Sequence, residues 1–157
     1  MRLLRLPMVS FGATSAIVTS VALIVGFGSA DVPKSVIVSS LLIVGLADNL
    51  TDTLSIHVFQ ESELLEQGAA FRATIGNFLA RACISATFVS LMVLLSGSLA
   101  VLSCLAWGSI LLVGLTYFVA RNRGASVTSE LIKHIGLAAV VIVASSLIGN
   151  WIGIFIH

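Results

Sequence analysis

Two acidic side chains interrupt an apolar stretch of this 157-residue chain. Asp48 and Asp52 are four residues apart, so a helix would place both on one face. A charged group at the centre of a bilayer costs roughly 2.5–3.5 kcal/mol on insertion scales, so such groups are usually paired, hydrated or used. Carboxylate oxygens suit hard divalent cations and protons, and no thiolate is spaced to make a copper site. The pair predicts an ion or proton pathway, with a protonated carboxyl hydrogen-bonded across helices as the alternative.

Hydroxyl side chains accompany the two carboxylates. Thr51 and Ser55 follow them on the same predicted face of the second apolar segment. In the first apolar segment, Ser15 lies at a depth similar to that of Asp52. Weak oxygen ligands suit ion movement, because the ion must bind without being held permanently. The residues expected to line the pathway are Asp48, Asp52, Ser15, Thr19, Thr51 and Ser55.

A second group of possible ligands follows the apolar stretch. His57 and Glu61 are an i, i+4 pair, and Glu63 comes two residues later. These side chains could capture a cation at the inner entrance of the pathway, or they could form a solvated helix end. His57 is expected on the opposite side of the helix from the aspartates. The candidate metal ligands are Asp48, Asp52, His57, Glu61 and Glu63.

The composition identifies the class of protein. The chain is 58% hydrophobic and only 10% charged, whereas soluble domains carry about 25% charged residues. It is therefore expected to be an integral membrane protein that contacts the lipid bilayer. The formal net charge of +1 predicts no nucleic-acid partner. Cys83 and Cys104 lie in apolar runs, and we expect them to be small buried hydrophobic residues without a disulfide.

Five segments are long enough to cross a bilayer, which takes about 20 apolar residues. They are roughly residues 9–29, 35–57, 75–96, 98–120 and 132–155. We predict an all-α membrane protein, residues 1–157 forming one five-helix domain, with a short cytoplasmic extension of the second helix over 58–71. Small residues on one face of the first segment, such as Gly12 and Gly26, are typical of close helix packing.

Basic residues predict the orientation of the spans. With the N-terminus in the cytoplasm, only Lys34 lies outside, and the C-terminus is also outside. Arg81, about one turn inside the boundary, is expected to extend to lipid phosphates, with pairing to an inner carboxylate such as Glu66 as the alternative. The short loops favour a prokaryotic inner membrane. The basic residues on the inner side are Arg2, Arg5, Arg72, Arg81, Arg121, Arg123 and Lys133.

Three stretches carry a family likeness: GATSAIVT over 12–19, LADNLTDTLS over 46–55 and IKHIGLAAVVIVASSLIGNWIG over 132–153. In them the chain resembles the vacuolar iron transporter family, which includes yeast vacuolar iron/manganese importers and plant nodulin-21-like proteins. The resemblance implies a homodimer of five-helix subunits, with the ion path between them and the first helices near the two-fold axis. It also implies export of Fe²⁺ or Mn²⁺ from the cytosol in exchange for protons. The metal is cargo, and no permanently bound cofactor is expected.

The chain departs from that family at its metal-binding positions. Ser15 stands where the family has Asp, Ile56 where it has Met, and Gln60 best matches a family Glu. The family's Glu-rich cytoplasmic insert is reduced to about residues 61–71. The chain therefore resembles a short, divergent member, in which the second helix supplies the ligands.

Two functions from different classes follow. The first is a homodimeric transporter of divalent metal ions, and the second is a non-transporting membrane module that senses metal or binds a partner. The absence from this chain of the Asp and the Met that the family has favours the non-transporting module. Enzyme activity is not expected, because an aspartyl dyad needs carboxylates that face each other, usually from different helices, and the GxGD signature is absent.

Overall fold

The computed structural model describes the backbone of residues 5–62 and 67–155, and side chains over 10–59, 71 and 74–155. In this part of the chain the only regular secondary structure is α-helix, and short turns connect the helices. Each helix is long and apolar enough to cross a membrane. The prediction of an all-α, five-span membrane protein is therefore confirmed. The helices are α1 (Arg5–Ser29), α2 (Lys34–Ser62), α3 (Gln67–Leu94), α4 (Gly97–Arg123) and α5 (Val127–Phe155).

The predicted spans differ from the helices mainly at one end of the bundle. α2 continues beyond residue 57 as expected, but the structure describes it only to Ser62. Residues 67–71, which we assigned to the same extension, belong to α3. The extra length is thus shared by two antiparallel helices, each of which satisfies its own backbone hydrogen bonds.

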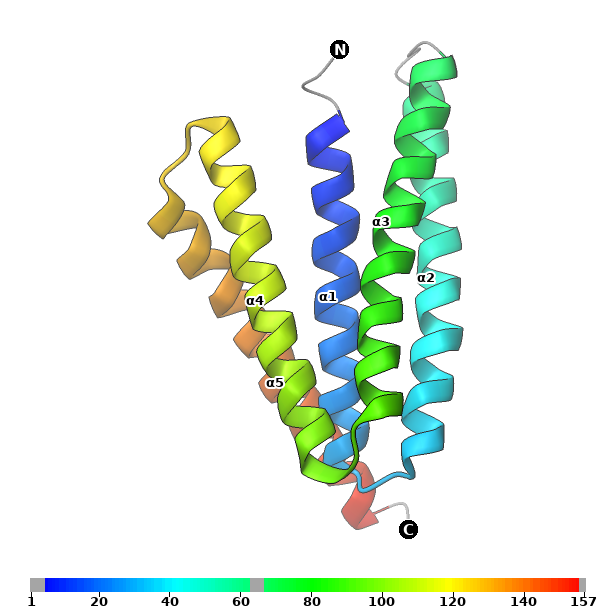
Figure 1. Cartoon of the computed structure of the whole chain (residues 1–157), viewed down its shortest axis with the longest axis vertical. Coiled ribbons are helices and arrows are strands. Elements are labelled where there is room, and N and C mark those ends of the chain that lie inside the picture. Colours follow the sequence, from blue (N-terminus) through cyan, green and yellow to red (C-terminus); the bar gives the residue numbers. More distant parts are fainter. Residues whose placement is uncertain (1–4, 63–66, 156–157) are drawn as a thin grey trace.

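α1 is the central helix of the bundle. Among the described residues, it contacts all four other helices, whereas α2 contacts only α1 and α3, and α5 contacts only α1 and α4. Figure 1 shows α2 and α3 on one side of α1, with α4 and α5 on the other. The helices alternate in direction, so the described ends of the chain lie at opposite ends of the bundle.

Lys34 connects two turns at the end of the bundle where the chain's C-terminus lies. Its Nζ donates to the carbonyl oxygens of Val93 and Leu95, at 2.9 and 2.7 Å, where α3 ends. A cation there satisfies helix carbonyls that lack an intrahelical partner. Asp31 has a left-handed φ of 54°, which Asp tolerates better than most residues. Pro33 precedes α2, where its fixed φ favours a helix start.

Small residues of α1 bring two different helices close. A Cβ added to Gly149 of α5 would lie 2.0 Å from the Gly26 carbonyl oxygen, and the Ser29 and Ser146 hydroxyls are 3.0 Å apart. Gly12 instead packs against α3. The predicted close packing of α1 is confirmed, but its small residues serve two partners. The buried apolar core includes Ile17, Val21, Ile24, Phe88, Met92 and Leu112.

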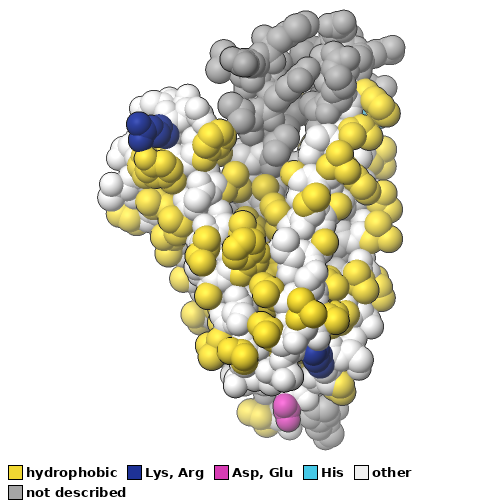
Figure 2. Space-filling model, in the orientation of Figure 1, with side chains coloured by type: hydrophobic (Ala, Val, Ile, Leu, Met, Phe, Trp, Pro, Cys, Tyr) yellow, Lys and Arg dark blue, Asp and Glu magenta, His cyan; other side chains and the backbone are white. Residues whose placement is uncertain are grey.

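The outer surface is largely apolar. Leu50, Leu54 and Ile110 are more than half exposed, as a lipid-facing surface requires. Figure 2 shows hydrophobic side chains along the described length of one face, with Lys and Arg side chains visible only towards its two ends. Cys104 is buried as predicted, but Cys83 is exposed, so that prediction was wrong for one cysteine. Cys83 lies on an exposed face of α3.

Candidate functional site

Arg81 of α3 is buried and lies at the centre of an ionic cluster whose carboxylates are partly exposed. Only 2% of its surface is exposed, and its Nη1 forms an ion pair with the Asp52 carboxylate of α2. Its Nη2 lies 4.0 Å from the Asp48 carboxylate. The prediction that Arg81 extends to lipid phosphates was wrong. α3 turns this residue towards α1 and α2, where charge pairing replaces the hydration that its guanidinium loses.

α1 contributes backbone to the same cluster. The Gly12 carbonyl oxygen accepts a hydrogen bond from Arg81 Nη1 at 3.3 Å. A Cβ at Gly12 would lie only 1.9 Å from Oδ1 of Asn77. The absence of a side chain at Gly12 therefore lets α1 approach α3 closely enough for its carbonyl to reach Arg81.

The surrounding layer is polar and deeply buried. Asn77 is 0% exposed, and neither its Oδ1 nor its Nδ2 has a hydrogen-bond partner among the described residues. Asn49 donates through Nδ2 to the Phe78 carbonyl at 3.0 Å, while its Oδ1 has no partner in the described structure. The same holds for Thr53 Oγ1. Unsatisfied polar atoms are uncommon in protein interiors, so this concentration marks a layer with a role beyond apolar packing.

Asp48 is the less compensated of the two carboxylates. When both are ionised, one guanidinium faces two negative charges, which leaves one in excess. Asp48 is farther from Arg81, and its side chain is 41% exposed against 30% for Asp52. A cavity of about 10 Å³ adjoins it, close to the smallest volume that holds one water molecule. A cation that balances the excess charge would therefore be held most readily at Asp48.

The structure separates the hydroxyl groups that we expected to line one pathway. Thr19 lines the small cavity beside Asp48, together with Ser20 and Ser85. Ser15 is half-buried on α1 and does not line that cavity. Thr51 and Ser55 are exposed on the outer surface of α2. α1 and α3 pack against the part of the α2 surface that bears Asn49 and Thr53. The part that bears Thr51 and Ser55 is left exposed.

α3 supplies site residues that the sequence reasoning missed or misassigned. Asn77, Arg81 and Ser85 lie on one face of α3, because they are spaced at i, i+4 and i+8. All three contact the layer described above. This polar stripe, which includes one arginine, was the sequence signal that could have identified these site residues. Polar neighbours on the same helix face distinguish an arginine that faces the interior of the bundle from one that lies at the membrane boundary.

The second predicted group remains largely untested. His57 is half-buried on α2, following Asn49 and Thr53 at i+8 and i+4 spacing. The Glu61 side chain and all of Glu63 lie outside the described structure. Within the described ranges, no three His, Cys, Asp or Glu side chains come close enough together to hold a metal ion. The entrance site formed by His57, Glu61 and Glu63 stays a prediction.

The fold and the cluster define a class: an integral membrane protein of five helices with an ion-paired polar layer between three of them. Comparison with known protein families, curated proteins and solved structures finds no match. Membership of the vacuolar iron transporter family therefore stays a prediction from the sequence stretches that resemble it.

Proposed function

We propose that this protein is a transporter of divalent metal ions, with Fe²⁺ or Mn²⁺ as the favoured cargo, which it exports from the cytosol in exchange for protons. The observation that carries the proposal is the cluster of Asp48, Asp52 and Arg81 in the interior of a membrane-spanning bundle. Ionisable groups at such positions commonly serve ion or proton pathways. The choice of metal rests on the family resemblance.

In this proposal the two carboxylates have different roles. Asp52 holds Arg81 in place, while Asp48 exchanges a proton for the cargo ion. Arg81 also keeps binding weak, because a divalent cation at the carboxylates would be repelled by the nearby guanidinium. Weak binding favours release, as transport requires. Thr19, Ser20 and Ser85 offer neutral oxygens beside Asp48.

Metal flux into proteoliposomes tests the proposal. We expect Asp48→Asn to abolish Fe²⁺ or Mn²⁺ flux while the protein stays folded, because the amide cannot release a proton or supply a negative charge. Asp31→Asn is the matched control, since Asp31 is exposed in the turn before α2. If Asp48→Asn and Asp52→Asn both transport like the parent, the site is wrongly assigned.

A non-transporting membrane module that senses metal or binds a partner is the second candidate. It is favoured by Arg81, which already pairs with the carboxylates, and by the lack of a three-ligand cluster among the described residues. This function predicts metal binding without flux. Calorimetric titration of Mn²⁺ in detergent, combined with the flux assay on the same preparation, separates the two.

We further propose a homodimer in which a second copy covers the outer surface of α2. That would bring Thr51 and Ser55 to a shared ion path, although both are exposed in the single chain. In a Cys83→Ala background, Ser55→Cys should form a cross-linked dimer in membranes. Leu102→Cys, exposed on α4, is the control that should not. Equal cross-linking at the two positions would contradict this interface.

The proposed orientation places the N-terminus in the cytoplasm and the C-terminus outside, in a prokaryotic inner membrane. It rests on the distribution of basic residues. Reporter fusions at the two termini should give opposite compartments, with the N-terminal reporter inside. A cytoplasmic C-terminal reporter would reverse the assignment.

A further inference from the structure

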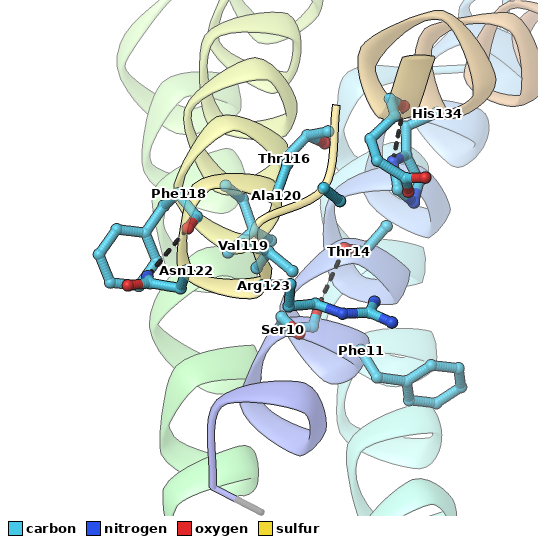
Figure 3. Close-up of a pocket in the computed structure, with 13 residues that line it drawn as sticks. Ser10, Phe11, Thr14, Thr116, Phe118, Val119, Ala120, Asn122, Arg123 and His134 are labelled. Carbon is cyan, nitrogen blue, oxygen red and sulfur yellow. Dashed lines mark hydrogen bonds between the residues drawn. The ribbon is translucent and has the colours of Figure 1, made fainter. Parts of the chain in front are cut away.

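A cavity of about 360 Å³ lies on the side of α1 that faces α4 and α5. Figure 3 shows it near the α4–α5 turn, with Ser10 and Thr14 of α1 facing Arg123 of α4 and His134 of α5. It shares no lining residue with the small cavity beside Asp48. Its volume falls within the range of roughly 300–1,000 Å³ that is typical of small-molecule sites.

The charged groups of this cavity favour an anion. Arg123 is exposed and forms no salt bridge within the described part of the chain. In Figure 3 its side chain extends from the end of α4 into the space between α4 and α1. The one acidic side chain in the wall, Glu130, is ion-paired with Lys133 at 3.0 Å. The guanidinium of Arg123 is thus the cation in the wall that has no ion-pair partner among the described residues, although Glu130 lies within range of its charge.

Besides hydroxyl, amide and imidazole groups, the wall has a large apolar part. It includes Phe11 of α1 and Leu115, Phe118, Val119 and Ala120 of α4. A small inorganic anion would contact Arg123 but would leave these surfaces without a partner. An anion that carries hydrocarbon would cover both parts of the cavity. The cavity lies where α4 ends, at an end of the bundle that also carries Arg121 and Lys133.

We propose that this cavity binds the headgroup of an anionic phospholipid, with the phosphate on Arg123 and the first methylene groups against Phe11, Leu115 and Phe118. Arg suits this role, because its planar guanidinium can donate two parallel hydrogen bonds to a phosphate. Basic pockets between membrane helices are known to take such headgroups on the cytoplasmic side. The proposal does not depend on transport, because it concerns the opposite side of α1.

Native mass spectrometry of the full chain in neutral detergent tests the site. The protein is titrated with phosphatidylglycerol, with phosphatidylcholine and with inorganic phosphate. We expect phosphatidylglycerol to bind more tightly than the other two. Arg123→Gln should weaken its binding by about tenfold, the factor expected for loss of one charge-assisted hydrogen bond.

Arg121→Gln is the matched control. Arg121 is also an exposed arginine in the last turn of α4, but its Nη1 donates to the Tyr117 hydroxyl at 2.6 Å and it does not line the cavity. Val119→Phe, which fills the cavity without altering charge, should also weaken lipid binding. The proposal is overturned if Arg121→Gln and Arg123→Gln weaken binding equally, if phosphatidylcholine binds as tightly, or if Val119→Phe has no effect. It is also overturned if inorganic phosphate binds as tightly as the lipid, which would indicate a site for the soluble ion.

Discussion

On one side of α1, Gly12 lets α3 come so close that a single added carbon would overlap Asn77, and the guanidinium of Arg81 is buried there and paired with Asp52. On the other side, α4 and α5 leave a cavity of about 360 Å³, and the guanidinium of Arg123 is exposed. Arg81 and Arg123 thus differ in how the positive charge of an arginine in a membrane protein can be balanced. Where helices pack tightly, the chain must supply the counter-charge itself, whereas an open site can take it from outside.

The largest expected effect comes from unpairing Arg81. Asp52→Asn removes the carboxylate that contacts its guanidinium, and arginine cannot lose its charge by deprotonation. Breaking a buried pair in this way costs about 3–5 kcal/mol. We therefore expect a large fall in the thermal unfolding temperature in detergent, with Asp31→Asn as the unchanged control. Arg81→Met should cost less, because the two carboxylates are partly exposed and are not left as fully buried charges. Equal unfolding temperatures for Asp52→Asn and Asp31→Asn would mean that the pair contributes nothing to stability.

The next effect is steric. Gly12→Ala would place a Cβ 1.9 Å from the Asn77 Oδ1, so α1 and α3 must separate or Asn77 must move. Overpacking of this kind costs about 1–3 kcal/mol. Gly114→Ala is the control, because nothing lies within 4 Å of a Cβ at that position of α4. The control should keep or slightly raise the unfolding temperature. If Gly12→Ala left the unfolding temperature unchanged, the packing on the two sides of α1 would accept added volume equally well.

A smaller effect is expected on the open side. Val119→Phe adds volume to the wall of the large cavity, where space is available. Its cost in unfolding free energy should stay below about 1 kcal/mol, the usual size for a substitution without a clash. The measurement is thermal unfolding in detergent without added lipid. A loss as large as that of Gly12→Ala would mean that the cavity closes in solution.

The smallest effect is expected at the start of α5. Glu130 and Lys133 form an exposed i, i+3 pair at 3.0 Å, and exposed pairs contribute little to stability. Glu130→Gln should leave the unfolding temperature unchanged within error. It should also strengthen phosphatidylglycerol binding, because it removes the only acidic side chain among the described residues that line the cavity. Weaker lipid binding by this variant would contradict the anionic site.

Much of the fold could be predicted from the order of residues. Long apolar runs have only one stable form in a bilayer, because a helix satisfies its own backbone hydrogen bonds. Composition and run length therefore determined the membrane class, the five helices and their boundaries at one end of the bundle. The spacing of Asp48 and Asp52 likewise determined that they share one helix face, and in the structure both face Arg81.

Only the tertiary structure decided which group the carboxylates meet. The sequence predicted Arg81 at the membrane boundary, but the packing of α3 against α1 and α2 directs it inward. Gly12 was predicted only as a packing residue, but its carbonyl oxygen accepts a hydrogen bond from Arg81. The same packing left Thr51 and Ser55 on the outer surface. Helical periodicity specifies which residues share a face, but which neighbour covers that face depends on contacts between helices distant in sequence. Those contacts are set by the close approach of small residues, here Gly12 to α3 and Gly26 to α5.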